Sequence, residues 1–174
     1  MSIIDSLIIY RTSADVSYAR QQTLKILRSG WDSLTESEQS EYLAGLKGAY
    51  NPSDLNRVTH AMEYLVERLR SYGYFVRYER VKVPHIEDNL DDYTWYHSDI
   101  PQAKELGMYL QNARKLRNTL ALFSNTPYVP DDMERFTFEE ANNFETILVN
   151  IEAVINLMIQ SWIYGGEIFS GEVI

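Results

Sequence analysis

The residues best suited to chemistry gather in one acidic stretch near the middle of the chain. Carboxylates and imidazoles together can bind a divalent cation, and a loop can wrap around one. Their spacing, however, matches neither an EF-hand loop nor a helical pair of zinc ligands. Because acidic runs are usually solvated surface, we predict no metal site. The stretch contains His85, Glu87, Asp88, Asp91, Asp92, His97 and Asp99.

The chain offers few groups for nucleophilic catalysis. It has no cysteine, which excludes thiol nucleophiles, disulfides and the common structural zinc sites. It has three histidines, and no serine lies in a Gly-x-Ser-x-Gly elbow. The pair Gly165-Gly166 follows an expected helix, whereas a phosphate-binding glycine loop precedes one. We therefore predict a protein that is not an enzyme, with no catalytic residue and no cofactor.

Aromatic residues are more informative, because several lie outside the apolar stripes of the expected helices. The chain has thirteen tyrosines and three tryptophans. Such side chains are favoured at protein–protein contacts, stack on sugars, and also seal loops onto helices. From the sequence, contact with another protein and the sealing of loops onto helices are equally favoured roles. The predicted partner-binding residues are Tyr74, Phe75, Tyr78, Tyr93, Trp95 and Tyr96.

Composition excludes several broad classes of protein. The 174 residues are 45% hydrophobic and 24% charged, as in an ordinary globular protein, and the net charge is −9. That charge disfavours nucleic acid and anionic membrane as partners, because each phosphate contact needs a cation. The longest apolar stretch, 147–162, is interrupted by polar residues at helical spacing, so an amphipathic helix is expected rather than a membrane span. No targeting segment is recognised, and synthesis in the cytosol is expected.

Periodicity and capping signals predict a mainly α protein. Thr35 with Glu38 forms one capping box and Thr137 with Glu140 a second. The clearest apolar stripe is Leu55, Val58, Met62, Leu65, Val66 and Leu69. The helices are expected over 14–28, from Thr35 to Gly48, over 52–72, from about 100 towards Phe123, and from 137 to about 162, where Gly165-Gly166 ends the last one.

The remaining segments complete the expected fold. Alternating aromatic and charged residues over 74–83 predict one short β element, and residues 167–174 are a second, shorter strand candidate. We expect an irregular bundle of about five helices in a single domain over 1–174. Its parts are a helical half over about 12–83, an acidic aromatic connection over about 84–99, and a helical half over about 100–174.

One corner between two expected helices has a distinctive sequence. A glycine ends one helix, and an asparagine followed by proline caps the next. A DNA-reading helix-turn-helix is one interpretation, but acidic residues along the second helix oppose it. The preferred interpretation is structural, with Asp54 and Arg57 paired at spacing i, i+3 or tied to neighbouring backbone. The predicted structural residues are Lys47, Gly48, Asn51, Pro52, Asp54 and Arg57.

The same corner carries a resemblance to a known family. The specific part is Leu46-Lys47-Gly48-Ala49-Tyr50-Asn51 together with Asp54-Leu55-Asn56-Arg57-Val58. Looser matches include Asp99-Ile100-Pro101, Gln111-Asn112, Ala141-Asn142, Glu145 and Gly165-Gly166. Over about residues 10–172 the chain resembles a module of phages and prophages of Gram-positive bacteria, found in small tail-associated proteins and in longer tail-tip or fibre proteins.

The resemblance implies a structural or host-interaction role in the distal tail or baseplate, and it brings no catalytic residues. The expected function is a virion component that binds other phage tail proteins, in a homo- or hetero-oligomer of symmetric arrangement. The expected location is the virion tail, after synthesis in the host cytoplasm. The alternatives are a module that binds host surface saccharide or teichoic acid, an assembly factor, and a DNA-binding protein. The acidic insertion 87–92 and the cluster 93–97 depart from the family pattern, so that surface is expected to be particular to this chain.

Overall fold

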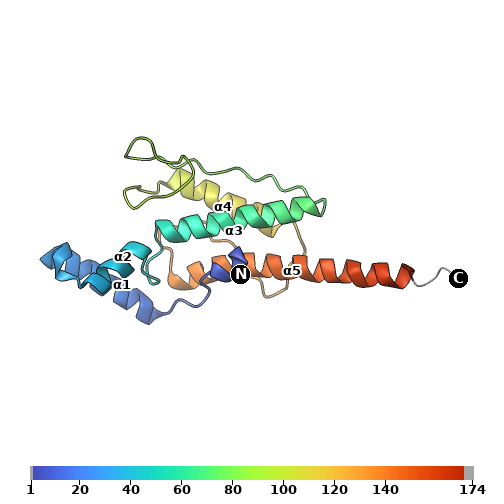
Figure 1. Cartoon of the computed structure of the whole chain (residues 1–174), viewed down its shortest axis with the longest axis horizontal. Coiled ribbons are helices and arrows are strands. Elements are labelled where there is room, and N and C mark those ends of the chain that lie inside the picture. Colours follow the sequence, from blue (N-terminus) through green and yellow to red (C-terminus); the bar gives the residue numbers. More distant parts are fainter. Residues whose placement is uncertain (1, 171–174) are drawn as a thin grey trace.

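A computed structural model describes residues 2–170, and over these residues the chain is mainly α (Figure 1). A short 3-10 helix, η1, precedes α1, and a second, η2, lies between α1 and α2. The five α-helices expected from periodicity are all present in the described part of the chain. The elements are η1 (Ile3–Ser6), α1 (Ser13–Ser29), η2 (Trp31–Ser33), α2 (Glu36–Ala44), α3 (Pro52–Ser71), α4 (Ala103–Arg117) and α5 (Phe138–Ser170).

Three helices, α3, α4 and α5, contact one another and enclose the core, with α3 lying alongside α5 (Figure 1). The apolar stripe predicted for α3 is entirely buried, which confirms the reading of its spacing. Phe144, Ile147, Leu148 and Ile151 of α5 face it and are fully buried. The core therefore contains residues from both halves of the sequence. The short helix η1 packs against α3 and α5.

The helices α1 and α2 form a lobe at the end of the molecule opposite the C-terminus (Figure 1). Within this lobe α1 packs mainly against η2, and little of its apolar surface is covered. Ala19 is the buried apolar residue of α1, whereas the apolar residues Val16 and Leu27 are exposed. Polar contacts hold the lobe instead: Lys25 pairs with Glu38 at 2.8 Å and lowers the pKa of that carboxyl to about 2.

Several helix ends differ from the prediction. The helix after Thr35 ends at Gly45, not at Gly48, because Gly45 adopts the positive φ that stops it. Helix α4 begins at Ala103 and ends at Arg117, so it is shorter than predicted at both ends. Helix α5 continues through Gly165-Gly166 to Ser170, because glycine permits a helix end without imposing one. The predicted tail strand is thus helical over 167–170, and 171–174 lie outside the described residues. No described helix has the length and apolar character needed to cross a membrane.

The β element predicted over 74–83 is absent: this segment is extended, and residues 2–170 contain no strand. Its backbone is held by a side chain instead of a neighbouring strand. The amide of Asn112 on α4 accepts from the N–H of Glu79 at 3.3 Å and donates to its carbonyl at 2.6 Å. A primary amide has the donor and acceptor of one peptide unit, so it can replace a strand at a single residue. Alternating residues therefore produced an extended chain, but no sheet.

The same pair of hydrogen bonds, from one asparagine side chain to one residue's backbone, occurs once on each of the three core helices. In every case one asparagine both donates to the carbonyl and accepts from the N–H of a single residue in an extended segment. These three asparagines attach the N-terminal segment, the segment 74–83 and the end of the acidic connection to the helices. The pairs are Asn142 with Arg11, Asn112 with Glu79, and Asn56 with Trp95.

Replacing Asn142 by alanine should lower the free energy of unfolding by about 1–3 kcal/mol, since the N–H and carbonyl of buried Arg11 would lose their partners. The matched control is Asn143→Ala, one position along the same helix and exposed, with an expected change within about 0.5 kcal/mol. Chemical denaturation of both variants measures the difference. Equal stabilities would contradict the role given to Asn142.

Candidate functional site

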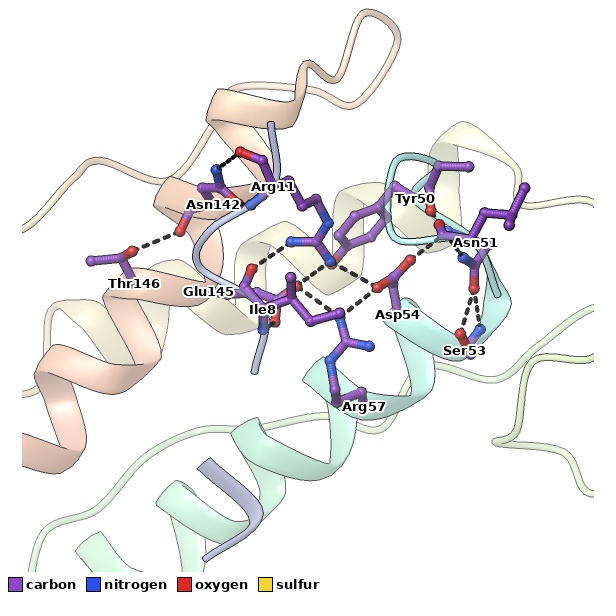
Figure 2. A network of polar contacts seen from close by, with 12 residues as sticks. Ile8, Arg11, Tyr50, Asn51, Ser53, Asp54, Arg57, Asn142, Glu145 and Thr146 are labelled. Carbon is purple, nitrogen blue, oxygen red and sulfur yellow. Dashed lines mark hydrogen bonds and ion pairs between the residues drawn. The ribbon is translucent and has the colours of Figure 1, made fainter. Parts of the chain in front are cut away.

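Four charged side chains form a network where the N-terminal segment, α3 and α5 meet (Figure 2). Arg11 Nη2 donates to Asp54 Oδ1 at 2.8 Å and to Glu145 Oε1 at 2.7 Å. Arg57 Nη2 donates to the same two oxygens, with 2.9 Å to Glu145. Each carboxylate thus lies between two guanidinium groups, and the four charges sum to zero.

This network lies inside the protein. Arg11, Asp54 and Glu145 are at most 3% exposed, and a buried charge is tolerated only when it is paired and hydrogen-bonded. The other oxygen of Glu145 accepts from the N–H of Ile8 at 2.6 Å, while Arg11 Nη1 donates to the carbonyl of Ile8 at 2.6 Å. The network therefore fixes the N-terminal backbone as well as the two helices.

The two carboxylates favour the charged form of Arg57. Burial alone would lower the pKa of the Arg57 guanidinium, but the charge and hydrogen bond of Glu145, followed by those of Asp54, outweigh it and raise that pKa. Above the network, the Arg11 guanidinium lies 5.5 Å from the ring centre of Tyr50, whose hydroxyl is 2.8 Å from that of Tyr109. Burial raises the pKa of both tyrosines, so both hydroxyls stay protonated. The arrangement holds fixed charges and is suited to joining segments.

The corner residues predicted to be structural surround this network. Asn51 caps α3 by accepting from the N–H of Ser53, and Pro52 is the first helical residue, as expected. The predicted i, i+3 pair of Asp54 with Arg57 is also confirmed. Lys47 pairs with Asp15 of α1 at 3.0 Å, so the corner holds the lobe as well.

The DNA-reading alternative finds no support at this corner. Asn56 is engaged by the backbone of Trp95, and Arg57 by two carboxylates, so neither is presented to a groove. His60 is exposed on the same helix, but Glu67 is exposed two turns further on and would repel phosphate.

Gly48 is required where the corner meets α1. A Cβ at this position would overlap the carbonyl of Asp15 and lie 2.5 Å from the nitrogen of Val16. Because these are backbone atoms, Gly48→Ala must displace the lobe and should cost about 1–3 kcal/mol of stability. Gly107→Ala on α4 is the matched control: its Cβ would meet nothing within 4 Å, and better helix propensity should stabilise the protein by up to about 1 kcal/mol. Thermal unfolding of the two variants should shift in opposite directions.

The six predicted contact aromatics do not share one environment. Phe75 is 84% exposed and Tyr93 is also exposed, with the guanidinium of Arg80 at 4.4 Å from the Tyr93 ring centre. The other four are partly or fully buried. Tyr74 and Tyr78 pack against the core, Tyr96 stacks at an angle on His85, and Trp95 is 4% exposed.

Trp95 therefore requires a correction, because it belongs to the core and is not a surface contact. Asn56 holds the backbone of Trp95 against α3 and thereby sets the direction of its ring. Asn56 and Trp95 are 39 residues apart, and no local pattern indicates that they pair.

An exposed aromatic group instead lies where α3 ends beside α5. Tyr72, at the C-cap of α3, meets Trp162 of α5 edge to face, with ring centres 5.5 Å apart. Phe75 follows three residues after Tyr72 and is 84% exposed. We define Tyr72, Phe75 and Trp162 as the distal patch. The apolar spacing of α5 predicts an inward position for Trp162, but its side chain is about half exposed.

Residues within the acidic connection form hydrogen bonds with one another. His85 Nδ1 lies 3.0 Å from an oxygen of Asp99 and its Nε2 lies 2.7 Å from the carbonyl of Asp91. The hydrogen bond with Asp99 raises the pKa of His85. His97 contacts the carbonyl of Leu43 on α2 instead. Among the described residues, no three His, Asp or Glu side chains are grouped as ligands for a metal ion.

Asp99-Ile100-Pro101-Gln102 has the residue pattern of a helix cap, but the carboxylate of Asp99 binds His85 and accepts from the N–H of Tyr96. This explains why α4 begins at Ala103, after Gln102.

Sequence reasoning did not identify Arg11 and Glu145 as partners. A signal was present for Glu145: it follows the buried residue Phe144 directly and precedes the buried residue Leu148 by three positions on α5. A carboxylate in an apolar stripe requires a buried cation, but nothing local indicates that the cation is Arg11, 134 residues away. Comparisons with protein-family models, curated proteins and solved structures found no match.

Proposed function

We propose that this chain is a non-enzymatic component of a phage tail, tail tip or baseplate, and that it binds other virion proteins through the distal patch. The observation that carries the proposal is the exposure of Tyr72, Phe75 and Trp162 where α3 ends beside α5. Aromatic side chains bury much area with few torsions, and clusters of them are typical anchors of protein interfaces.

Two further observations support a binding role over catalysis. The charged groups most able to act as acids or bases, Asp54 and Glu145, are enclosed and occupied by arginines. The resemblance to tail-associated modules rests on residues that hold the fold, including Gly48, Asn56 and Glu145, and a shared fold without shared chemistry fits a structural component.

The test is quantitative mass spectrometry of particles purified from the phage or prophage that encodes this chain. The proposal expects its peptides at a fixed ratio to the tail proteins. Abundance in the lysate together with absence from the particles would overturn the assignment.

A second arm tests the distal patch in particles complemented with variant chains. Phe75→Ala combined with Trp162→Ala should reduce incorporation by about tenfold or more, as expected for interface anchors. Tyr128→Ala is the matched control, since Tyr128 is 83% exposed but lies in the loop after α4. Normal incorporation of the double variant, with wild-type folding by circular dichroism, would remove the distal patch from the proposal.

A further inference from the structure

An apolar pocket of about 320 Å³ lies between the first half of α4 and the loop before α5. Leu106 and Leu110 of α4 line it on one side, and Pro101 and Met133 on the other. A second hollow of about 290 Å³ shares Pro101, Leu106 and Met133 and extends towards Phe136. Together they form a groove, which we call the α4 groove, with room for aliphatic side chains of a partner.

The rim of this groove is acidic. Asp131, Asp132 and Glu134 line it, and its lining includes no Lys or Arg. Gly107 forms part of the helical wall, and a Cβ there would meet nothing within 4 Å, so the wall is open towards the pocket. A groove of this kind is complementary to an apolar side chain with cations beside it.

A surface with that chemistry is present on α1 of the same chain. Arg20, Leu24, Leu27 and Arg28 follow the spacing i, i+4, i+7, i+8 and share one face of the helix. Leu27 is 76% exposed, and neither arginine has an ion-pair partner among the described residues. Helix α1 carries three cations and one carboxylate in a chain of net charge −9. We call these four residues the α1 stripe.

We propose that the α1 stripe of one copy docks into the α4 groove of another copy, with Leu27 in the apolar pocket and Arg20 and Arg28 against the rim carboxylates. The lobe that carries α1 is held in place by Lys47–Asp15 and Lys25–Glu38, so the stripe is presented outward from a fixed position. Two different surfaces meet, so the contact is heterologous and generates either a closed ring or an open filament. This inference rests on charge and shape, independently of the tail assignment.

The first measurement is the mass of the purified wild-type chain by sedimentation velocity, from micromolar to submillimolar concentration. The average mass should rise above the 20.3 kDa of one copy as concentration increases. Added salt should weaken the association, because ion pairs at the rim are screened. A wild-type chain that stays monomeric at low salt over the whole range would overturn the proposal.

Two single variants then separate the two surfaces. Leu27→Asp places a carboxylate against the acidic groove, and Gly107→Gln introduces a long side chain into the pocket wall at a position where a Cβ meets nothing within 4 Å. Each should weaken self-association by at least about tenfold, the loss expected for an interface anchor. Leu43→Asp is the matched control, since Leu43 is an exposed leucine of the same lobe outside the stripe, and it should associate like wild type. Helical circular dichroism verifies that all three fold.

Mixing the two variants gives the decisive result. A heterologous contact leaves one intact stripe on Gly107→Gln and one intact groove on Leu27→Asp, so the mixture should form a one-to-one dimer and stop there. Absence of that dimer, or wild-type assembly by either single variant, would show that copies do not meet through these surfaces.

Discussion

Replacing Glu145 by glutamine is expected to lower the free energy of unfolding by about 3–5 kcal/mol, because the change leaves the buried Arg11 and the partly buried Arg57 with the single carboxylate of Asp54. Removing one partner of a buried pair costs much more than the net value of the pair, since the remaining charge loses its compensation without regaining water. The corresponding fall in Tm is on the order of 10 °C for a chain of this size.

Chemical denaturation with fixed m-value analysis is the measurement for this variant. Glu139→Gln is the matched control, because Glu139 is exposed near the start of the same helix and should change stability by less than about 0.5 kcal/mol. Adding Arg57→Gln to Glu145→Gln restores the charge balance, so the double variant should lose less than the two single losses combined. Additive losses would mean that the network is not coupled.

Truncating Trp95 to alanine is expected to cost about 3–5 kcal/mol, the range for deleting a large aromatic side chain from a core. The cavity would open next to α3, and the acidic connection would lose the ring that anchors it there. Phe75→Ala, which removes a ring that is 84% exposed, should change stability by less than about 0.5 kcal/mol.

The two aromatic variants are compared by denaturant midpoint and by the helical signal before unfolding. If Trp95→Ala kept wild-type stability and lost only association with a partner, the tryptophan would be a surface contact and its placement in the core would be wrong. If Phe75→Ala were strongly destabilising, the distal patch would be part of the fold.

The helices and most of their beginnings, α4 excepted, could be predicted because their causes are local. The stripe of α3 repeats every three to four residues, and it is buried in full. The capping boxes at Thr35 and Thr137 join residues three positions apart, and both form as predicted. The pair of Asp54 with Arg57 spans the same distance along one helix. Such contacts depend on backbone geometry that the sequence specifies within a few residues.

Contacts between distant segments could not be predicted in this way. Whether 74–83 joins a sheet depends on what lies beside it, and Asn112 of α4 occupies the backbone groups that a strand would use. Whether Trp95 faces outward depends on Asn56, 39 residues earlier in the sequence. A high content of aromatic residues is expected both at a protein interface and in a core, so composition alone does not distinguish the two.

The amino-acid sequence by itself determined the mainly α class, the starts of the capped helices α2, α3 and α5, and the structural character of the corner at Gly48 and Asp54. The tertiary structure alone decided that Arg11 neutralises Glu145, that Trp95 is buried and that the α4 groove is lined with carboxylates. The physical reason is that periodicity and capping act along the chain, whereas the desolvation of a charge or a ring depends on the segments that fold against it.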